Sequence, residues 1–548
     1  FIKHPFCNRK FSIIADQSVD ICFGTGAVKI TPYHDPIDYE IGNRHALQGI
    51  NIFDDEGRIV EELELCENYK HFIGMKRFDA RKSVIDCLKK LELFVRKIDH
   101  SYVIPICSRS KDIIEPVLKS QWYVKCKDMA NKACMAVKCG ELKIYPNSHE
   151  KTWFYWMENI QDWCISRQLW WGHRVPAYFV TSSQFNSNRD DENYWVSAAS
   201  LDEAIDIAEE KFNISRTDLI LTHDEDVLDT WFSSGLLPLS VFGWPDNESE
   251  FDIFYPTTLL ETGYDILFFW VARMVMLSVE LTGLIPFKHI LLHSIIRDSH
   301  GRKMSKSLGN IIDPVHVIEG ISLELLQKQL SSYNIDFNEL EKAKKGQIKD
   351  YPNGIPECGS DALRFTLCCY SGSKKDINLD VLRVQGYRFF CNKIWNAARF
   401  CFNYFDSHQF IDYKLNFNNI SLMDKWILSR LSYAEEICNT SFEKYDLSTA
   451  TTAIYNFWLY DFCDIYIESV KPILNGGNYD IIKISLKIMF ICVDFGLRLL
   501  HPFMPFITEE LYQRLPFNSS HFENTPSICV SDYPFQLDWR NETLDVNI

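Results

Sequence analysis

The chain has 548 residues, of which 46% are hydrophobic, and a formal net charge of −17. This hydrophobic content supports sizeable cores and excludes a largely disordered chain, and the length predicts roughly three to five domains. The acidic balance excludes a protein that coats nucleic acid generally. It does not exclude nucleic-acid binding by a local basic surface, because counterion release depends on the residues at the contact.

The 18 cysteines predict reduced, buried side chains and no zinc site, because no two of them are separated by two residues as in a zinc knuckle. The most apolar stretches, 265–281 and 487–506, are interrupted by charged residues, so we expect no membrane span. A cytoplasmic enzyme is the default expectation. The chain starts at Phe1 without a methionine, which predicts a piece of a longer product and leaves a mitochondrial presequence open.

The first hundred residues alternate short β-rich runs with turn signals. Val19–Ile30 is predicted as strand material broken at the Gly-Thr-Gly of residues 24–26. Pro36 then suits the first position of a helix, with Asp35 as its N-cap. Residues 76–98 predict a basic helix.

The middle of the chain predicts an α/β arrangement. A helix-like run from Ile266 to Leu281 is followed by a β-branched strand, Ile290–Ile296, which leads directly into a loop rich in lysine. In open parallel sheets, ligands bind at the carboxyl ends of the strands. The lysine-rich loop is therefore predicted to lie at a ligand-binding edge.

The C-terminal part predicts a helical bundle, because apolar residues recur at helical spacing. The stripes are Ile427, Leu431 and Ala434; Ala450, Ile454 and Phe457; and Leu486, Met489 and Phe490. A final helix is predicted at Thr508–Leu515, after two prolines.

Residues 303–307, Lys-Met-Ser-Lys-Ser, match the phosphate-binding loop that marks class I aminoacyl-tRNA synthetases. Lys303 and Lys306 can converge on adjacent phosphates of a nucleotide, and Gly301 and Gly309 permit the backbone angles of a closing loop. Fixed ammonium groups stabilise the charge that grows on phosphate oxygens, and losing one such group typically costs about 2.7–4 kcal/mol. Both lysines are therefore predicted to be catalytic.

Two residues upstream of this loop have two possible roles each. Asp265 follows Gly263 at the start of a predicted helix, where it either caps the helix or binds a substrate ammonium or ribose hydroxyl. Trp231 is either a core residue or the wall of a small apolar pocket.

Four segments, in order and spacing, resemble the valyl-tRNA synthetases; isoleucyl and leucyl enzymes share the architecture. The segments are 162–174, 226–235, 261–274 and 301–310. The resemblance implies an α/β fold: the second half of a class I Rossmann catalytic domain, a partial α/β editing (CP1) domain and a C-terminal α-helical anticodon-binding bundle. The implied domains are a partial editing domain (1–105), a connection to the catalytic core (106–160), the Rossmann half (161–300), a phosphate-loop and stem-contact region (301–415) and the anticodon-binding domain (416–548).

The resemblance also implies the substrates and the residues that bind them. These substrates are valine, ATP with Mg²⁺, and tRNA(Val). Trp231 and Ile266 would shape the valine pocket, and Asp265 would hold the α-ammonium group. Gly263 would lie near the adenylate and His293 near adenine, although a lone histidine can equally be a packed strand residue. Lys306 would contact ATP.

Residues 24–40 resemble the core of the family's editing domain, where Lys29, Thr31, Asp35 and Asp38 would line the editing pocket. A small apolar pocket cannot strongly reject threonine in place of valine, so a second, hydrolytic site is needed. Asp35 would hold the aminoacyl ammonium, and Asp38, with Lys29 and Thr31, would recognise the threonine hydroxyl. The two aspartates also make a sensible helix N-terminal pair, and both roles can coexist.

The His-x-Gly-His motif of class I enzymes does not occur in this sequence. Two hypotheses follow: a piece of a working valine–tRNA ligase that also hydrolyses threonyl-tRNA(Val), or an inactive tRNA-binding or interaction remnant of one. An isoleucyl-type synthetase is a further alternative. We expect the 548-residue chain alone to be inactive in aminoacylation.

Overall fold

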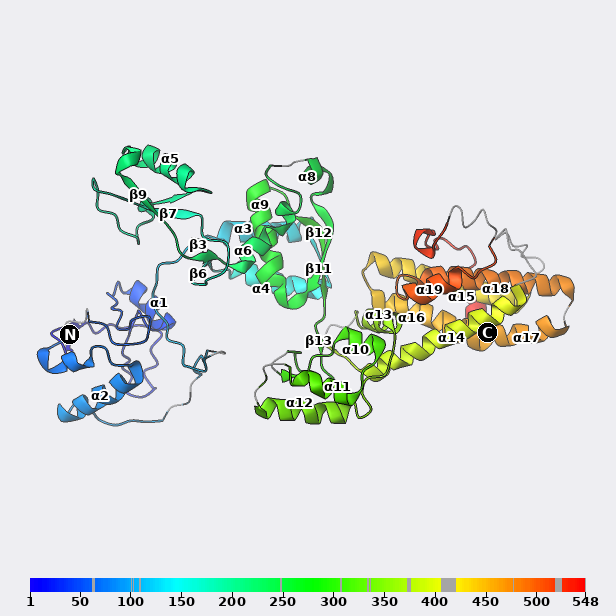
Figure 1. The fold of residues 1–548 in the computed structure, drawn as a ribbon, viewed down its shortest axis with the longest axis horizontal. Helices are drawn as coiled ribbons and strands as arrows, with labels where there is room; N and C mark the ends of the chain where they lie inside the picture. The colour runs from blue at the N-terminus through cyan, green and yellow to red at the C-terminus, as the bar shows by residue number, and fades with distance from the viewer. Residues whose placement is uncertain are drawn as a thin grey trace. The chain divides into compact units, whose positions relative to one another are not determined.

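Figure 1 shows the computed structural model, which describes residues 1–548 except 62–64, 100, 102, 108–109, 247–248, 306–307, 333–334, 336, 372–375, 406–419, 477, 518–524 and 548. The described residues form two compact units. One contains residues 1–123 and 164–227, and the other contains residues 124–163 and 228–548. The chain passes between them within three two-residue strands, β3 (Tyr123–Val124), β5 (Trp163–Cys164) and β10 (Val227–Leu228). The five-domain division implied by the resemblance stays a prediction.

In the first unit, a helix begins where the sequence predicts it. Helix α1 (Pro36–Arg44) has Asp35 as its N-cap, and Asp35 Oδ1 accepts hydrogen bonds from the backbone N–H groups of Ile37 (2.9 Å) and Asp38 (3.1 Å). These bonds satisfy amides that the first helical turn leaves without partners. The predicted helix start is confirmed.

Residues 19–30 do not form the predicted strand. They make successive turns, in which the Phe23 N–H donates to the Asp20 carbonyl (3.2 Å) and the Gly26 N–H donates to the Phe23 carbonyl (3.0 Å). Gly24 and Gly26 have φ angles of +61° and +71°, in the left-handed region. The predicted break at residues 24–26 is confirmed, but the strand prediction is wrong on both sides of it, because the turns begin before Gly24 and residues 27–30 have no regular secondary structure.

The basic helix predicted at 76–98 is α2 (Arg77–Lys90), which ends earlier. Glu92 adopts a left-handed φ of +58°, and the Leu93 N–H donates back to the Leu88 carbonyl (2.9 Å). Such a C-terminal bond closes a helix. The left-handed residue and this bond end the helix before residue 98, although apolar residues such as Leu93 and Val95 continue after it.

A three-stranded antiparallel sheet lies in the same unit, with the order β8 (Trp195–Ser197), β7 (Ala177–Ser182), β9 (Leu219–His223). Helix α5 (Leu201–Phe212) packs its small, fully buried residues Ala204 and Ala208 into the core of this sheet. The other strands of the unit are β1 (Ile2–Lys3), β2 (Lys10–Phe11) and β6 (Ser166–Arg167).

The second unit contains a parallel sheet, with the order β11 (Thr257–Gly263), β12 (Phe287–His293), β4 (Lys143–Tyr145). The strand predicted at 290–296 is confirmed as β12, which starts earlier and ends at His293. Because β11 and β12 are parallel and in register from Thr257 and Phe287 to Gly263 and His293, their carboxyl ends lie side by side.

Helices pack on this sheet. The run predicted at 266–281 is helical: a short 3₁₀ turn at Tyr264–Ile266, a π-helical segment at Leu267–Ala272, and α9 (Arg273–Thr282). The first six residues of α9, Arg273 to Ser278, are buried. The accompanying helices are α3 (Lys127–Lys138), α4 (Glu150–Glu158), α6 (Thr230–Gly235), α7 (Leu237–Ser240) and α8 (Ser249–Phe254).

After β12, the chain forms a short parallel pair, β13 (Ile296–Arg297) with β14 (Ile377–Asn378). The helices that lie between these strands in the sequence are α10 (Pro314–Glu319), α11 (Leu323–Leu330), α12 (Phe337–Asp350) and α13 (Ser360–Tyr370).

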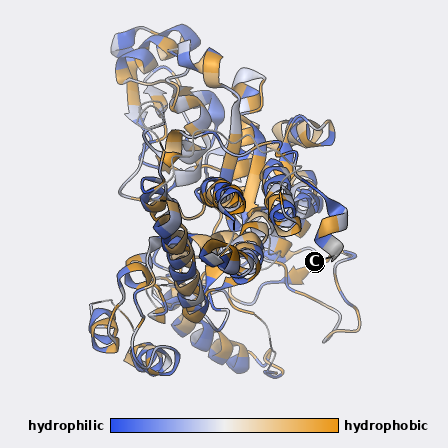
Figure 2. Cartoon of the chain, turned by 90° about the vertical axis from the view of Figure 1, so that its right-hand side faces the viewer, coloured by the Kyte–Doolittle hydropathy of each residue, from blue (hydrophilic) through white to orange (hydrophobic). Residues whose placement is uncertain are grey.

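The predicted helical bundle is confirmed. It consists of α14 (Val381–Phe405), α15 (Leu422–Glu443), α16 (Leu447–Asn456) with a π-helical continuation at Phe457–Tyr466, α17 (Ile467–Gly476), α18 (Tyr479–Leu500), α19 (Pro505–Tyr512) and α21 (Glu542–Asn547). All nine residues of the three predicted apolar stripes are buried. Figure 2 shows helices with both hydrophobic and hydrophilic sides, as expected of amphipathic helices around a core.

Helix α13 ties the bundle together at the turn between α18 and α19. The Asp361 carboxylate accepts the backbone N–H groups of Phe506 (3.2 Å) and Ile507 (2.7 Å), and Arg364 Nη2 donates to the Pro502 carbonyl (3.0 Å). Two side chains one helical turn apart thus satisfy one helix end and the next helix start. In the described part of the chain, no helix is both long and apolar enough to cross a membrane.

Candidate active site and editing pocket

The carboxyl ends of β11 and β12 bring Gly263 and His293 into register. A side chain at Gly263 would have its Cβ 2.8 Å from Ile295 Cδ1 and 2.9 Å from Asp265 Oδ1, so any other residue would displace the ends of these two side chains. The His293 ring pairs with the Glu261 carboxylate (Nε2 to Oε1, 3.3 Å) and is about half exposed. His293 is therefore an accessible residue at the strand end, not a packed interior one.

Asp265 and Lys303, predicted from separate motifs, lie together. Their Oδ2 and Nζ atoms are 3.7 Å apart. Asp265 lies inside the first turn after β11, and Gly263 holds the N-cap position, so capping does not account for the carboxylate. Because both side chains are substantially exposed, this pair contributes little to stability and leaves both charges available to ligands. Lys306 lies outside the described residues.

The base of the lysine loop is clamped by Asp298 and Asn310, which the sequence analysis did not single out. The buried Asp298 carboxylate accepts the backbone N–H of Arg302 (2.8 Å) and the Asn310 side-chain amide (2.9 Å). Asn310 also accepts the Ser305 N–H (2.9 Å) and donates to the Lys303 carbonyl (3.3 Å). The Asp298 carboxylate thus bonds both ends of the loop, at Arg302 and at Asn310.

The Asp298 carboxylate stays charged at neutral pH. Burial works to raise its pKa, but the hydrogen bonds from Asn310 and Arg302 and the Arg302 charge together lower the pKa below its ordinary value. A lowered folded-state pKa gives stabilisation that is complete above the ordinary carboxyl range and is lost as the pH falls through the folded pKa. The clamp therefore persists throughout the neutral range.

Replacing Asn310 with alanine is expected to loosen the loop without unfolding the protein. The three lost hydrogen bonds predict roughly 10-fold faster tryptic cleavage after Arg302 and Lys303, measured by mass spectrometry of timed digests. Asn353→Ala, on the connection after α12, is the matched control. Equal cleavage rates in the two variants would contradict the clamp.

Trp231 and Ile266 lie on neighbouring elements. The Trp231 ring stacks on Phe269 (6.1 Å between centroids, 29°), and both Trp231 and Ile266 are only partly buried, so neither is a plain core residue. The Arg273 guanidinium lies 5.7 Å from the centre of the Phe269 ring. Arg273 also forms a buried ion pair with Asp229, in which Nη1 lies 3.3 Å from Oδ2. The sequence analysis did not single out this ion pair; the only indication of it in the sequence was Asp229, two residues before Trp231.

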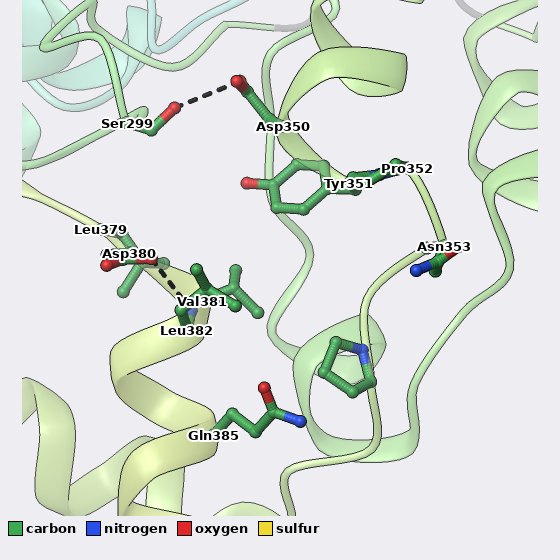
Figure 3. Close-up of a pocket in the computed structure, with 12 residues that line it drawn as sticks. Ser299, Asp350, Tyr351, Pro352, Asn353, Leu379, Asp380, Val381, Leu382 and Gln385 are labelled. Carbon is green, nitrogen blue, oxygen red and sulfur yellow. Dashed lines mark hydrogen bonds between the residues drawn. The ribbon is translucent and has the colours of Figure 1, made fainter.

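A cavity of about 450 Å³ lies beside the loop base and is lined by residues 299, 350–354, 356, 379–382 and 385. Figure 3 shows these side chains. The Tyr351 ring extends between Asp350, which accepts the Ser299 hydroxyl (3.2 Å), and Asp380. Burial, then the charges of Asp350, Asp380 and Asp298, raise the pKa of Tyr351 to about 12. An acidic cavity repels phosphate, which disfavours this cavity as a nucleotide site.

In the first unit, the candidate editing residues divide into two roles. Asp38 Oδ2 accepts both the backbone N–H (2.8 Å) and the hydroxyl (3.0 Å) of Thr31. Burial lowers the pKa of Lys29, and the negative charge of the Asp38 carboxylate opposes that shift. Asp35 serves as the cap of α1, and its exposed side chain also faces solvent. The structure thus brings Thr31 and Asp38 into contact, and Lys29 lies near enough for its charge to interact with Asp38.

Within the described ranges, no three histidine, cysteine or acidic side chains are grouped as a metal site. The expected absence of zinc stays a prediction.

Comparison with known proteins agrees with this fold. Residues 37–380 match the family model for class I tRNA synthetases (I, L, M and V), and residues 424–548 match the anticodon-binding domain of tRNA ligases. The chain therefore belongs to the class I tRNA synthetases of the isoleucine, leucine, methionine and valine group.

Within this family, the chain is similar to curated proteins named valine–tRNA ligase. Those of Takifugu rubripes and Caenorhabditis elegans are each 52% identical to it, over 100% and 99% of this chain and 45% and 52% of their own lengths. The chain thus spans about half the length of these relatives. A solved structure of Mycobacterium tuberculosis methionyl-tRNA synthetase in complex with methionyl-adenylate superposes on this chain with a TM-score of 0.51 and 16% sequence identity. The match covers 76% of this chain and 67% of that structure's chain, and it supports the fold.

Proposed function

We propose that this chain serves a valine–tRNA ligase, which activates valine with ATP, as its Mg²⁺ complex, and transfers it to tRNA(Val). The single observation that carries the proposal is the meeting of Gly263, Asp265 and Lys303 where β11 ends beside β12. It places a carboxylate for an ammonium group beside a lysine for phosphate. The similarity to valine–tRNA ligases supplies the amino acid.

In the first step, a carboxylate oxygen of valine attacks the α-phosphorus of ATP, and pyrophosphate leaves. Asp265 holds the valine ammonium, while Trp231 and Ile266 border its side chain. Lys303 and Lys306 stabilise the charge that grows on the phosphate oxygens. Gly263 lets the adenylate approach the β11 backbone, and His293 lies on the adenine side. A tRNA hydroxyl then attacks the valyl carbonyl, and AMP leaves.

We further propose that residues 29–38 of the first unit hydrolyse threonyl-tRNA(Val). Asp38, already bonded to Thr31, can accept a hydrogen bond from the threonine hydroxyl. Valine lacks that hydroxyl and would leave the polar groups without a partner.

The cytoplasmic location also stays a prediction.

The test is ATP–pyrophosphate exchange by the full-length protein with valine, threonine or isoleucine. Valine should support the fastest exchange. Threonine should be weaker by about 100-fold, the known limit for a valine-selecting pocket, and isoleucine should be excluded by its size. Fastest exchange with isoleucine would indicate an isoleucyl-type enzyme. No exchange with any of them would favour an inactive tRNA-binding remnant.

A further inference from the structure

Asp376 joins two parts of the candidate active site that are far apart in the sequence. Its Oδ1 accepts the Tyr264 hydroxyl (2.7 Å), and its Oδ2 accepts Arg297 Nε. The carboxylate is mostly buried, with 17% of its side chain exposed. Tyr264 lies in the segment 261–274 that carries the family resemblance, but none of the three was predicted as a site residue.

On one side, Tyr264 belongs to the substrate turn. It lies between Gly263, at the end of β11, and Asp265, the candidate ammonium ligand. Its ring also stacks on His149 (5.7 Å, 21°). The stacked ring and the hydrogen-bonded hydroxyl hold Tyr264 in place. Because Asp265 follows Tyr264 directly, Asp376 also restrains the backbone that carries Asp265.

On the other side, Arg297 belongs to the base of the lysine loop. It ends β13, and its Nη1 donates to the Gly301 carbonyl (3.3 Å). Arg297 also forms an isolated antiparallel bridge with Lys303. The position of the Lys303 backbone therefore depends on where Arg297 is held.

The segment that carries Asp376 is itself anchored. Strand β14 follows Asp376 directly, and the Ile377 N–H donates to the Ile295 carbonyl (2.9 Å). The Leu379 N–H donates to the Arg297 carbonyl (3.1 Å). A carboxylate next to an anchored strand gives both partners, Tyr264 and Arg297, a fixed contact point.

The protonation states suit this role. Burial works to raise the pKa of Asp376, but bonds from Tyr264 and Arg297 and the Arg297 charge lower it below the ordinary value. The bond to Asp376, with burial, raises the pKa of Tyr264. At neutral pH the carboxylate is charged and the phenol keeps the proton that it donates.

We propose that Asp376 is a positioning residue, which holds the base of the lysine loop, through Arg297, in register with the Tyr264–Asp265 turn. This inference rests on the proposed activation of an amino acid. Asp376 acts through Tyr264 and Arg297. It sets the distance between the group that binds the ammonium and the lysine that meets the phosphates, so its loss should reduce the rate of activation more than substrate binding.

The test is Asp376→Asn in the full-length protein, measured by valine-dependent ATP–pyrophosphate exchange. Loss of one charge-assisted bond predicts about a 10-fold lower kcat, with the KM for valine changed less than about 2-fold. Asp380→Asn is the matched control, because Asp380 is on the same segment but bonds the Leu382 N–H (2.9 Å) at the start of α14. It should retain wild-type exchange.

A double variant separates positioning from general damage. If Asp376 acts through Lys303, then adding Asp376→Asn to Lys303→Ala should lower kcat by less than about 2-fold, whereas independent effects would multiply. Tyr264→Phe removes only a hydroxyl and should give about a 3-fold loss, which keeps the test available if Asp376→Asn does not fold.

The outcomes distinguish this inference from the proposed function. A wild-type protein without amino-acid-dependent exchange would overturn the proposed function. An active wild type would overturn the positioning role alone if the Asp376→Asn and Tyr264→Phe variants kept wild-type kcat, or if the losses from Asp376→Asn and Lys303→Ala multiplied.

Discussion

Lys303→Ala is expected to slow valine activation by about 100-fold, because it removes one ammonium group from the developing charge on the phosphates. The residue lies 3.7 Å from Asp265, so the lost charge comes from the site itself. The measurement is kcat for valine-dependent ATP–pyrophosphate exchange by the full-length protein. Lys306→Ala is expected to behave alike, by resemblance to the family loop.

Two comparisons give this prediction its specificity. Lys342→Ala removes an equally exposed lysine, which pairs with Glu339 on α12 (2.7 Å), and should leave exchange unchanged. Hydrolysis of threonyl-tRNA(Val) by Lys303→Ala should also stay near wild type, because the editing residues lie in the other compact unit. A comparable loss in both reactions would count against separate sites.

Asp38→Ala is expected to let threonyl-tRNA(Val) accumulate. Removing the carboxylate deletes a charged acceptor for the threonine hydroxyl and leaves the Thr31 N–H and hydroxyl without their partner. Hydrogen bonds to charged groups contribute about 1.5–3 kcal/mol, which predicts a roughly 10- to 100-fold slower deacylation. The measurement is the rate of hydrolysis of pre-formed threonyl-tRNA(Val), with valine activation as the internal reference.

Asp35→Asn tests the second aspartate of the candidate editing site separately. Asparagine is as good an N-cap as aspartate, so α1 should keep its start while the charge at position 35 is lost. If Asp35 holds the aminoacyl ammonium as well, deacylation will slow in this variant too. Unchanged deacylation in Asp38→Ala would reduce Asp38 to a structural residue of the helix start.

Local sequence determined the elements that depend on short-range physics. The Asp35–Pro36 pair specified where α1 begins, and helical spacing of apolar residues specified the bundle. The same reasoning failed at residues 19–30. There the apolar pattern favoured a strand, while the left-handed angles of Gly24 and Gly26 decided for turns.

The candidate site was predictable only where a single motif carries it. The lysine loop, Asp265 and Gly263 each stand in a recognisable segment, and their resemblance to synthetase motifs predicted that they act together. The supporting groups were not predictable in this way. Asp298 and Asn310 are separated by eleven residues, and nothing in either residue type indicates a clamp.

The sequence by itself determined the family, the start of α1 and the helices of the C-terminal bundle that carry the three apolar stripes, because each of these depends on short segments of the chain; the phosphate-binding role of the lysines stays a prediction. The tertiary structure alone decided which distant groups meet. Tyr264 and Asp376 are 112 residues apart, and only parallel pairing of β13 with β14 brings the second to the first. Hydrogen bonds require approach to about 3 Å, which the folded backbone supplies and a linear pattern cannot.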